Sequence, residues 1–360
     1  MGPSFSPLAE ALDLGSSGYS PWIVAGAVRL GTMGPFGPAA ALLHWFTGVR
    51  MSPATLRRLT LAAGTTVRQI ERDFSAAVRT TGGVAEAVAD VPRQLSIDGS
   101  MVHLRTEGWR EAKLLAIGNR GAEWPLTALS YAATLGTAAA FGDEALGELG
   151  RRGIPQASDV VTVNDGAEWI QGFVDLHCPQ AHRVLDFAHA AGYLATAATA
   201  TFGEGTDAGA AWFRGQRREL RDGDPEAVLA ALAVLPASEA RDTALDYLTA
   251  RRTQIAYRDF RARGWPIGSG CVESGHKGVI QGRLKGRGMR WARPVAEGLI
   301  ALRIVNANDR WTTTWAQVGP RQRADHRART AARRTIRRAR APSWRPRWPG
   351  WTRCGPFLPI

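Results

Sequence analysis

The sequence contains little cysteine and no long apolar run. Its 360 residues include only three scattered cysteines, Cys178, Cys271 and Cys354, which argues against a disulfide framework and predicts a reducing, cytoplasmic environment. No stretch reaches the roughly 18 uninterrupted apolar residues that a membrane span requires. The N-terminus also lacks the basic-then-apolar pattern of a signal peptide. We therefore expect no membrane partner.

Acidic residues are scarce at one end of the chain only. The formal net charge is +13, but residues 321–360 hold 12 arginines against a single acid, Asp325, and so account for +11 of it. Residues 1–320 carry only +2. A basic surface attracts nucleic acid. Over most of the chain, any path for DNA must therefore be a local patch.

The stretch from Gly264 to Trp291 contains the most distinctive local pattern. Pro266–Gly270 reads Pro-Ile-Gly-Ser-Gly, which is turn chemistry, and Ser269 or Gly270 can then cap a new helix. A carboxylate in the first turn stays ionised near the helix dipole, and a lysine one turn later suits a metal beside a phosphate. The alternative is a glutamate that only complements the dipole. Spacings of three and four predict one shared helix face for Glu273, Lys277, Ile280 or Gln281, and Leu284.

Two aspartates stand where short apolar strands end. Asp98 lies near the end of a strand over 92–99, and Asp165 follows a β-branched strand over 159–164. With Glu273 they form the ligand set for two hard cations in an RNase H-like nuclease. Carboxylate oxygens suit Mg²⁺, and a metal pair can clamp the attacking and leaving oxygens of a phosphodiester. The pattern therefore predicts two Mg²⁺ ions, with Mn²⁺ as a substitute.

These blocks together resemble the DDE transposases of bacterial insertion sequences, specifically the ISKra-type family, from about Phe5 to Trp315. The matching text is Ser-Ile-Asp-Gly-Ser-Met-Val (96–102), Glu-Gly-Trp-Arg-Glu-Ala-Lys (107–113), Asn-Asp-Gly-Ala-Glu-Trp-Ile (164–170) and Gly-Ser-Gly-Cys-Val-Glu-Ser (268–274). In the family a Cys-rich zinc-binding segment usually precedes the text that starts here at Phe5, and residues 1–4 contain no cysteine.

The resemblance implies a catalytic triad of Asp98, Asp165 and Glu273 that holds two Mg²⁺ ions. It implies cleavage of DNA at the ends of an insertion sequence, followed by strand transfer into target DNA. The implied partners are the terminal inverted repeats and the target DNA, bound by a homo-oligomer. The implied location is the bacterial cytoplasm, on the nucleoid.

Asp186-Phe-Ala-His189 is a D-x-x-H unit. Related transposases carry such a unit between the second aspartate and the glutamate, and the resemblance implies that Asp186 and His189 orient the metal site or the flanking DNA. The alternative is an aspartate that caps the next helix beside a histidine satisfied by packing.

Five basic residues are predicted to contact DNA. Lys277, Arg283 and Lys285 follow Glu273, and all three lysines of the chain fall inside the resembling blocks. Arg57 and Arg58 lie on a helix predicted to run from Pro53 to a stop at Gly64, preceded by a helix over 38–46 and followed by another over 67–80. This pattern is compatible with a helix-turn-helix and equally with a helical packing domain.

The fold class is predicted as α/β. The element order, three strands, helix, strand, helix, strand, is that of an RNase H-like mixed sheet with helices on its faces, here interrupted by an all-α insertion that ends in one long helix over 238–263. The predicted domains are 1–90, a helical N-terminal domain; 91–190, the first part of the catalytic core; 191–263, the all-α insertion; 264–318, the glutamate helix and the closing helix of the core; and 319–360, an Arg/Pro/Trp-rich tail, disordered except for a helix over 323–340 that forms on DNA.

Two other functions stay open. The first is a catalytically inactive, decayed or repurposed transposase that acts only as a DNA-binding protein. It is favoured by Gly275, Gly278 and Gly282, which weaken the glutamate helix by up to about 1 kcal/mol each. The second is an RNase H-like nuclease that cuts any duplex.

Overall fold

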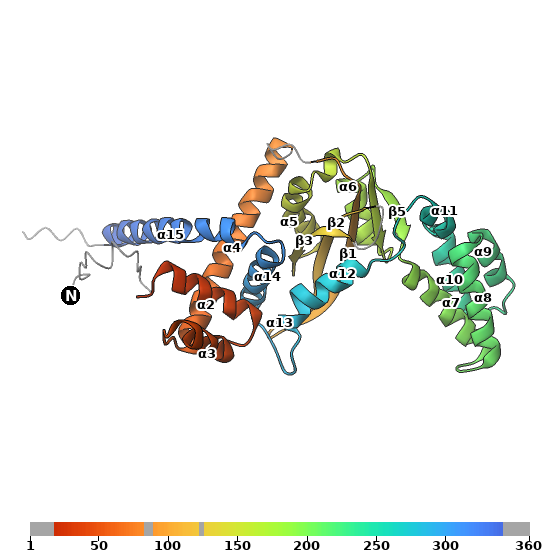
Figure 1. Cartoon of the computed structure of the whole chain (residues 1–360), viewed down its shortest axis with the longest axis horizontal. Coiled ribbons are helices and arrows are strands. Elements are labelled where there is room, and N and C mark those ends of the chain that lie inside the picture. Colours follow the sequence, from red (N-terminus) through yellow and green to blue (C-terminus); the bar gives the residue numbers. More distant parts are fainter. Residues whose placement is uncertain (1–17, 83–88, 122–125, 341–360) are drawn as a thin grey trace, which may run out of the picture. The chain divides into compact units, whose positions relative to one another are not determined.

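A five-stranded mixed sheet forms the core of the computed structural model, which describes residues 18–82, 89–121 and 126–340 (Figure 1). The strands are β1 (Arg93–Leu104), β2 (Gly108–Asn119), β3 (Thr127–Thr134), β4 (Val160–Asn164) and β5 (His182–Leu185). They lie in the order β3-β2-β1-β4-β5, with β1–β2 and β2–β3 antiparallel and β1–β4 and β4–β5 parallel. The prediction of a mixed sheet in an α/β fold is confirmed.

Helices cover both faces of the sheet, as alternation along the strands requires. On β1, Leu95 and Ile97 pack on one face against α5 (Ala138–Arg151) and α6 (Glu168–His177). Val102 and Leu104 point to the other face, where they share a cluster with side chains of α12 (Gly270–Gly275) and α14 (Arg293–Ala307). All five residues of β4 are buried, as expected for a central parallel strand.

An all-helical segment follows β5 and lies together at that edge of the sheet (Figure 1). The prediction of a single long helix over 238–263 is wrong, because helix α10 (Glu239–Ala250) ends well before residue 263. Two tertiary hydrogen bonds hold the chain beyond this helix: Arg251 Nη2 donates to Gly166 O at 2.9 Å, and Tyr257 Oη donates to Leu185 O at 2.9 Å. The elements are α7 (Phe187–Phe202), α8 (Asp207–Asp222), α9 (Pro225–Ala233), α10 (Glu239–Ala250), η3 (Arg252–Gln254) and α11 (Tyr257–Ala262).

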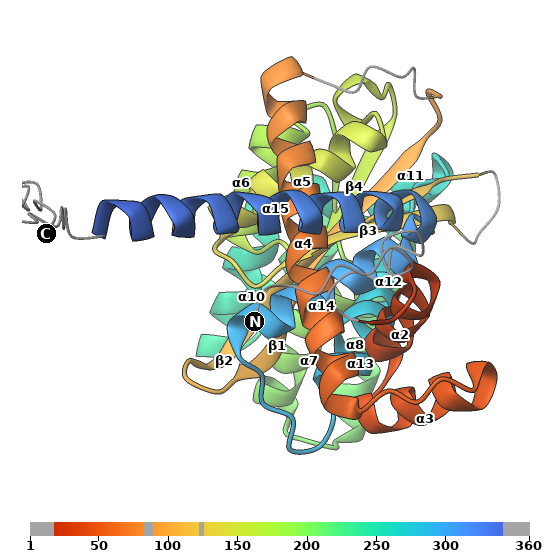
Figure 2. The ribbon, with the colours of Figure 1, turned by 90° about the vertical axis from the view of Figure 1, so that its left-hand side faces the viewer.

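Three helices precede the sheet: α2 (Pro21–Met33), α3 (Phe36–Thr47) and α4 (Pro53–Thr81). The prediction that Gly64 ends a helix is wrong, since α4 runs through it without a break. Gly64 instead lets α4 approach α14, which lies beside it in Figure 2, because a Cβ at Gly64 would lie 2.7 Å from Gly298 O. The close helix crossing explains this glycine.

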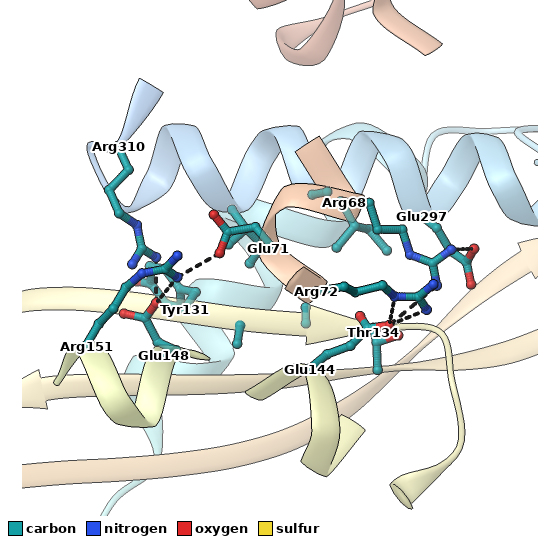
Figure 3. A pocket seen from close by; sticks show the side chains of 15 residues that line it. Arg68, Glu71, Arg72, Tyr131, Thr134, Glu144, Glu148, Arg151, Glu297 and Arg310 are labelled. Carbon is teal, nitrogen blue, oxygen red and sulfur yellow. Dashed lines mark hydrogen bonds and ion pairs between the residues drawn. The ribbon is translucent and has the colours of Figure 1, made fainter. Parts of the chain in front are cut away.

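Between α4, α5, α14 and β3 lies a cavity of about 50 Å³ with a charged lining (Figure 3). Four arginines and four glutamates of this lining form the pairs Arg68–Glu297, Arg68–Glu144, Arg72–Glu144, Arg151–Glu71, Arg151–Glu148 and Arg310–Glu148. Their charges cancel, so this part of the lining offers no net charge to a ligand. The network ties α4 to the helices that cover the sheet, and none of the predicted site residues lines the cavity.

The chain divides into two units, Met1–Val318 and Gly319–Ile360. Helix α15 spans Trp311–Arg340, so it contains the helix predicted over 323–340, and the prediction of disorder over 319–322 is wrong. Alanine and arginine are strong helix formers, which explains a helix without DNA. The expectations for 1–17, 83–88 and 341–360 lie outside the described residues. Within the ranges the structure describes, no helix combines the length and apolarity needed to cross a membrane.

Candidate active site

The two predicted aspartates lie side by side on neighbouring strands. The β1–β4 register pairs Leu95 with Thr162, and its continuation brings Asp98 level with Asp165. Asn164 prolongs the contact beyond the regular ladder, because its Oδ1 accepts the Ile97 N–H at 2.6 Å. The prediction that Asp98 stands near a strand end is wrong, because β1 continues to Leu104 through its pairing with β2. The middle of β1 is therefore fixed against the end of β4.

Each aspartate is also oriented by a neighbouring backbone amide. Asp98 Oδ1 accepts the Gly99 N–H at 2.7 Å, and Asp165 Oδ1 accepts the Ala167 N–H at 3.0 Å. Both side chains are partly exposed, so each keeps a second oxygen available for a ligand.

Glu273 reaches the site on α12. The start of this helix is held by a side chain from β1 and by one at the end of β5. Gln94 on β1 donates from Nε2 to Gly268 O at 3.2 Å. Asp186 at the end of β5 accepts from the Ser269 N–H at 2.8 Å and the Ser269 hydroxyl at 2.9 Å. Gly275 then brings the helix onto the sheet, since a Cβ there would lie 2.7 Å from the Tyr131 ring and 2.8 Å from Leu114 Cδ2.

Ser269 occupies the N-cap position of α12, but its hydroxyl makes no capping hydrogen bond to the helix. Of the two predicted capping residues, Ser269 is therefore the one at the helix start, but it does not cap the helix through its side chain. The physical reason is that the hydroxyl donates to Asp186 instead.

The predicted continuous helix after Glu273 is also wrong. The six-residue α12 passes into a π-helical segment, η4 (His276–Gln281), and a short α13 (Gly282–Leu284). Carbonyls in the π segment are satisfied from outside: Arg303 donates to Gly278 O and, from Nε at 2.5 Å, to Val279 O. The changed helical phase leaves Glu273 and Lys277 exposed and buries Ile280 and Leu284. Short π segments occur frequently at functional sites.

The charges of the two other predicted carboxylates act on Asp98. Partial burial raises the pKa of Asp98 above its ordinary value, and the negative charges of Asp165 and Glu273 raise it further, against the opposing effects of the Gly99 amide and His276. Both carboxylates therefore lie within electrostatic reach of Asp98. The site concentrates negative charge, which a divalent cation would neutralise, so these residues suit Mg²⁺.

Among the described residues, no three His, Cys, Asp or Glu side chains converge closely enough to hold one ion. In a site with two metal ions, each ion needs fewer protein ligands. Mg²⁺ is usually held by one or two carboxylates, while water and substrate phosphates complete its shell.

The D-x-x-H unit has a structural role for each residue. Asp186 is buried, and its Oδ1 caps α7 by accepting the His189 N–H at 2.8 Å. Because Oδ2 binds Ser269, the same carboxylate also positions the glutamate helix. The His189 ring is exposed and packs edge-on against Tyr193 and Tyr247, with ring centroids 5.5 and 5.9 Å away.

Four of the five predicted DNA contacts are accessible. Lys277, Lys285, Arg57 and Arg58 are all exposed. Arg283 is buried at 3% exposure, with its guanidinium over the rings of Phe36 and Trp291. Its burial contradicts the prediction of a DNA contact, because it joins the end of the glutamate segment to the N-terminal helices instead.

The all-helical segment reaches the site through a clamp that the sequence did not predict. Tyr247 Oη donates to Asp165 O, while Arg251 donates to Gly166 O and lies 3.7 Å above the Tyr247 ring. Gly166 fits under both because its φ is +79° and a Cβ would lie 2.5 Å from Tyr247 Oη. An open cleft of about 550 Å³ starts at this point, lined from Gly166 to Glu168 and by α10.

His276 is a further residue that sequence reasoning missed. It lies on the sheet side of the π segment, and its Nε2 is 3.7 Å from Asp98 Oδ2. Burial lowers its pKa, against the opposing charge of Asp98. The only signal in the sequence was its place three residues after Glu273.

Comparison with known protein families finds no family model that matches the chain, and no curated protein matches it significantly.

Proposed function

We propose that this chain is a DDE transposase with an RNase H-like catalytic core. Its activity would be metal-dependent cleavage of DNA at insertion-sequence ends and transfer of the cut strand into target DNA. The observation that carries the proposal is the placement of Asp98 and Asp165 side by side on neighbouring strands, with Glu273 close enough for its charge to act on Asp98. The strand order β3-β2-β1-β4-β5, with β2 antiparallel to both its neighbours, supports the RNase H-like class.

The chain's own residues have separable tasks in this reaction. Asp98, Asp165 and Glu273 would bind two Mg²⁺ ions, which activate the attacking oxygen and neutralise charge on the leaving oxygen. Asp186 holds the start of the glutamate helix through Ser269. The Tyr247–Arg251 clamp fixes the backbone beside Asp165. Both supports keep the carboxylates preorganised.

DNA would approach from the exposed side of the glutamate segment. Lys277 and Lys285 are exposed there, and Lys277 lies one turn beyond Glu273, where an ammonium group can bind a phosphate next to the metals. Arg57 and Arg58 provide a second basic surface on α4. We further propose that the enzyme acts as a homo-oligomer on paired element ends, in the cytoplasm at the nucleoid.

The test uses the full chain, Mg²⁺, and two DNA duplexes: one carrying the sequences that flank the gene and one unrelated. Cleavage confined to the flanking ends, with joining to a target, is the expected result. Equal cutting of both duplexes would identify a sequence-independent nuclease. Binding without cutting in either Mg²⁺ or Mn²⁺ would identify an inactive DNA-binding protein.

A further inference from the structure

One buried polar side chain beside the carboxylates lacks a hydrogen bond of regular geometry. His276 is 2% exposed, and neither of its ring nitrogens makes such a bond among the described residues, although the nearby Asp98 backbone opposes the lowering of the ring's pKa by burial. Buried polar groups are nearly always hydrogen-bonded, and each one left unpaired costs about 1–3 kcal/mol. Apolar packing alone therefore does not explain a histidine at this position.

The backbone is built to bring this ring to the site. Glu273 stands on the exposed side of α12, whereas the π segment that begins at His276 turns the imidazole inward. Arg303 supports that segment by donating to Gly278 O and Val279 O, and it also donates to Thr32 O at 2.6 Å. The result is an imidazole edge facing the carboxylate of Asp98.

The separation of these two groups fits shared coordination better than a hydrogen bond. His276 Nε2 and Asp98 Oδ2 are 3.7 Å apart, beyond hydrogen-bonding distance. Two ligand atoms about 2.1 Å from one ion lie roughly 3–3.4 Å apart. A shift of a few tenths of an ångström, on the order of a side-chain adjustment, would therefore bring both onto a common ion.

Imidazole nitrogen also changes which metal is preferred. Mg²⁺ takes almost only oxygen ligands, whereas imidazole suits first-row transition metals.

We propose that His276 Nε2 and Asp98 Oδ2 together bind one divalent transition metal, with Mn²⁺ preferred over Mg²⁺ at this position. The assignment rests on the proposed function in treating Asp98 as a metal ligand, and it adds a nitrogen ligand to the oxygen-only set of Asp98, Asp165 and Glu273. Solvent and substrate oxygens would complete the shell.

The test measures Mn²⁺ binding to the full-length protein without DNA, by pulsed electron paramagnetic resonance. The wild-type protein should show ¹⁴N coupling from one imidazole. His276→Ala should lose this coupling and bind Mn²⁺ at least about tenfold more weakly, with Mg²⁺ affinity little changed. The matched control is His182→Ala, an exposed histidine on β5, which should keep both the coupling and the affinity.

Absence of ¹⁴N coupling in the wild-type protein overturns the assignment without any variant, and so does coupling that survives in His276→Ala. If the alanine variant does not fold, His276→Asn provides the same comparison with a smaller loss of volume. The cleavage assay separates this inference from the proposed function. Coupling without cleavage would refute only the transposase, whereas cleavage without coupling would refute only the nitrogen ligand.

Discussion

Asp186 Oδ2 accepts both the backbone N–H and the hydroxyl of Ser269, at 2.8 and 2.9 Å. Its other oxygen caps α7, so one buried carboxylate joins the end of β5, the all-helical segment and the start of the glutamate helix. The geometry of Asp186 is therefore consistent with both explanations of the D-x-x-H aspartate, a residue that orients the site and a residue that caps the next helix.

Replacing Asp186 by alanine should destabilise the protein by about 1–3 kcal/mol, because buried N–H groups lose their acceptor. Cleavage should slow by about 10–100-fold, as expected when a supporting residue is lost. Ser269→Ala removes only the hydroxyl and should cost about 1 kcal/mol or less. Urea unfolding and cleavage rates of the two variants check this order, and equal losses of stability would refute it.

Gly166→Ala should disturb the Asp165 loop. Alanine at a positive φ costs about 1–2 kcal/mol, and the added Cβ would also meet Tyr247 Oη and Arg251 Nε. The control is Gly172→Ala on α6, where no atom lies within 4 Å of the new Cβ and alanine should stabilise the helix by about 0.5–1 kcal/mol. The unfolding temperature should fall in Gly166→Ala and rise in Gly172→Ala. An unchanged unfolding temperature in Gly166→Ala would show that Tyr247 and Arg251 can move away from the new Cβ at no cost.

Glu148→Gln should destabilise the protein by about 1–3 kcal/mol, because a nearly buried carboxylate that pairs with Arg310 and Arg151 loses its charge. Glu148 is 3% exposed and pairs with Arg310 at 2.5 Å (Figure 3). Asp143→Asn is the control, since Asp143 pairs with Arg79 on the surface and should lose about 1 kcal/mol at most. Urea unfolding measures both, and similar losses would show that burial does not govern the network.

Asp98→Asn should stabilise the metal-free protein at neutral pH while abolishing activity. The pKa of Asp98 is raised in the folded state, so the folded protein binds more protons than the unfolded chain, and stability falls as pH rises through this window. Asparagine does not ionise, so the variant does not lose stability as the pH rises. Thermal unfolding in a chelator should favour the variant at pH 7, with the difference vanishing below about pH 4, the ordinary pKa of aspartate.

Addition of Mg²⁺ should reverse that order, since a ligand of the folded state raises the melting temperature of the wild-type protein only. A variant that is less stable than the wild-type protein at every pH, with or without metal, would contradict the account.

The strands and most helices could be predicted because their signals are local. A buried β-branched run marks β4, and a serine–proline pair marks the start of α4. The wrong predictions concern residues whose contacts are far away in the sequence. Gly64 resembles a helix stop by propensity, but it faces Gly298 across a helix crossing.

The site shows the same division. Asp165 could be placed from the end of its strand and Glu273 from the turn before its helix, whereas Asp98 was predicted on a strand but lies in its middle, because pairing with β2 extends β1 to Leu104. The π segment could not be predicted, because its carbonyls depend on Arg303, some 24 residues away in sequence. Arg283 and His276 were therefore assigned to the wrong side or missed, since a change of helical phase decides which of them is buried.

The most direct test of the account compares two glutamate-to-glutamine variants on DNA that carries the gene's flanking ends. Glu273→Gln should bind this DNA as the wild-type protein does and should not cut it in Mg²⁺, because the amide cannot supply the charge that holds the metal. Glu168→Gln, an exposed glutamate three residues beyond Asp165, should cut at the wild-type rate. If Glu273→Gln also cuts the ends at that rate, the three carboxylates are not the catalytic centre.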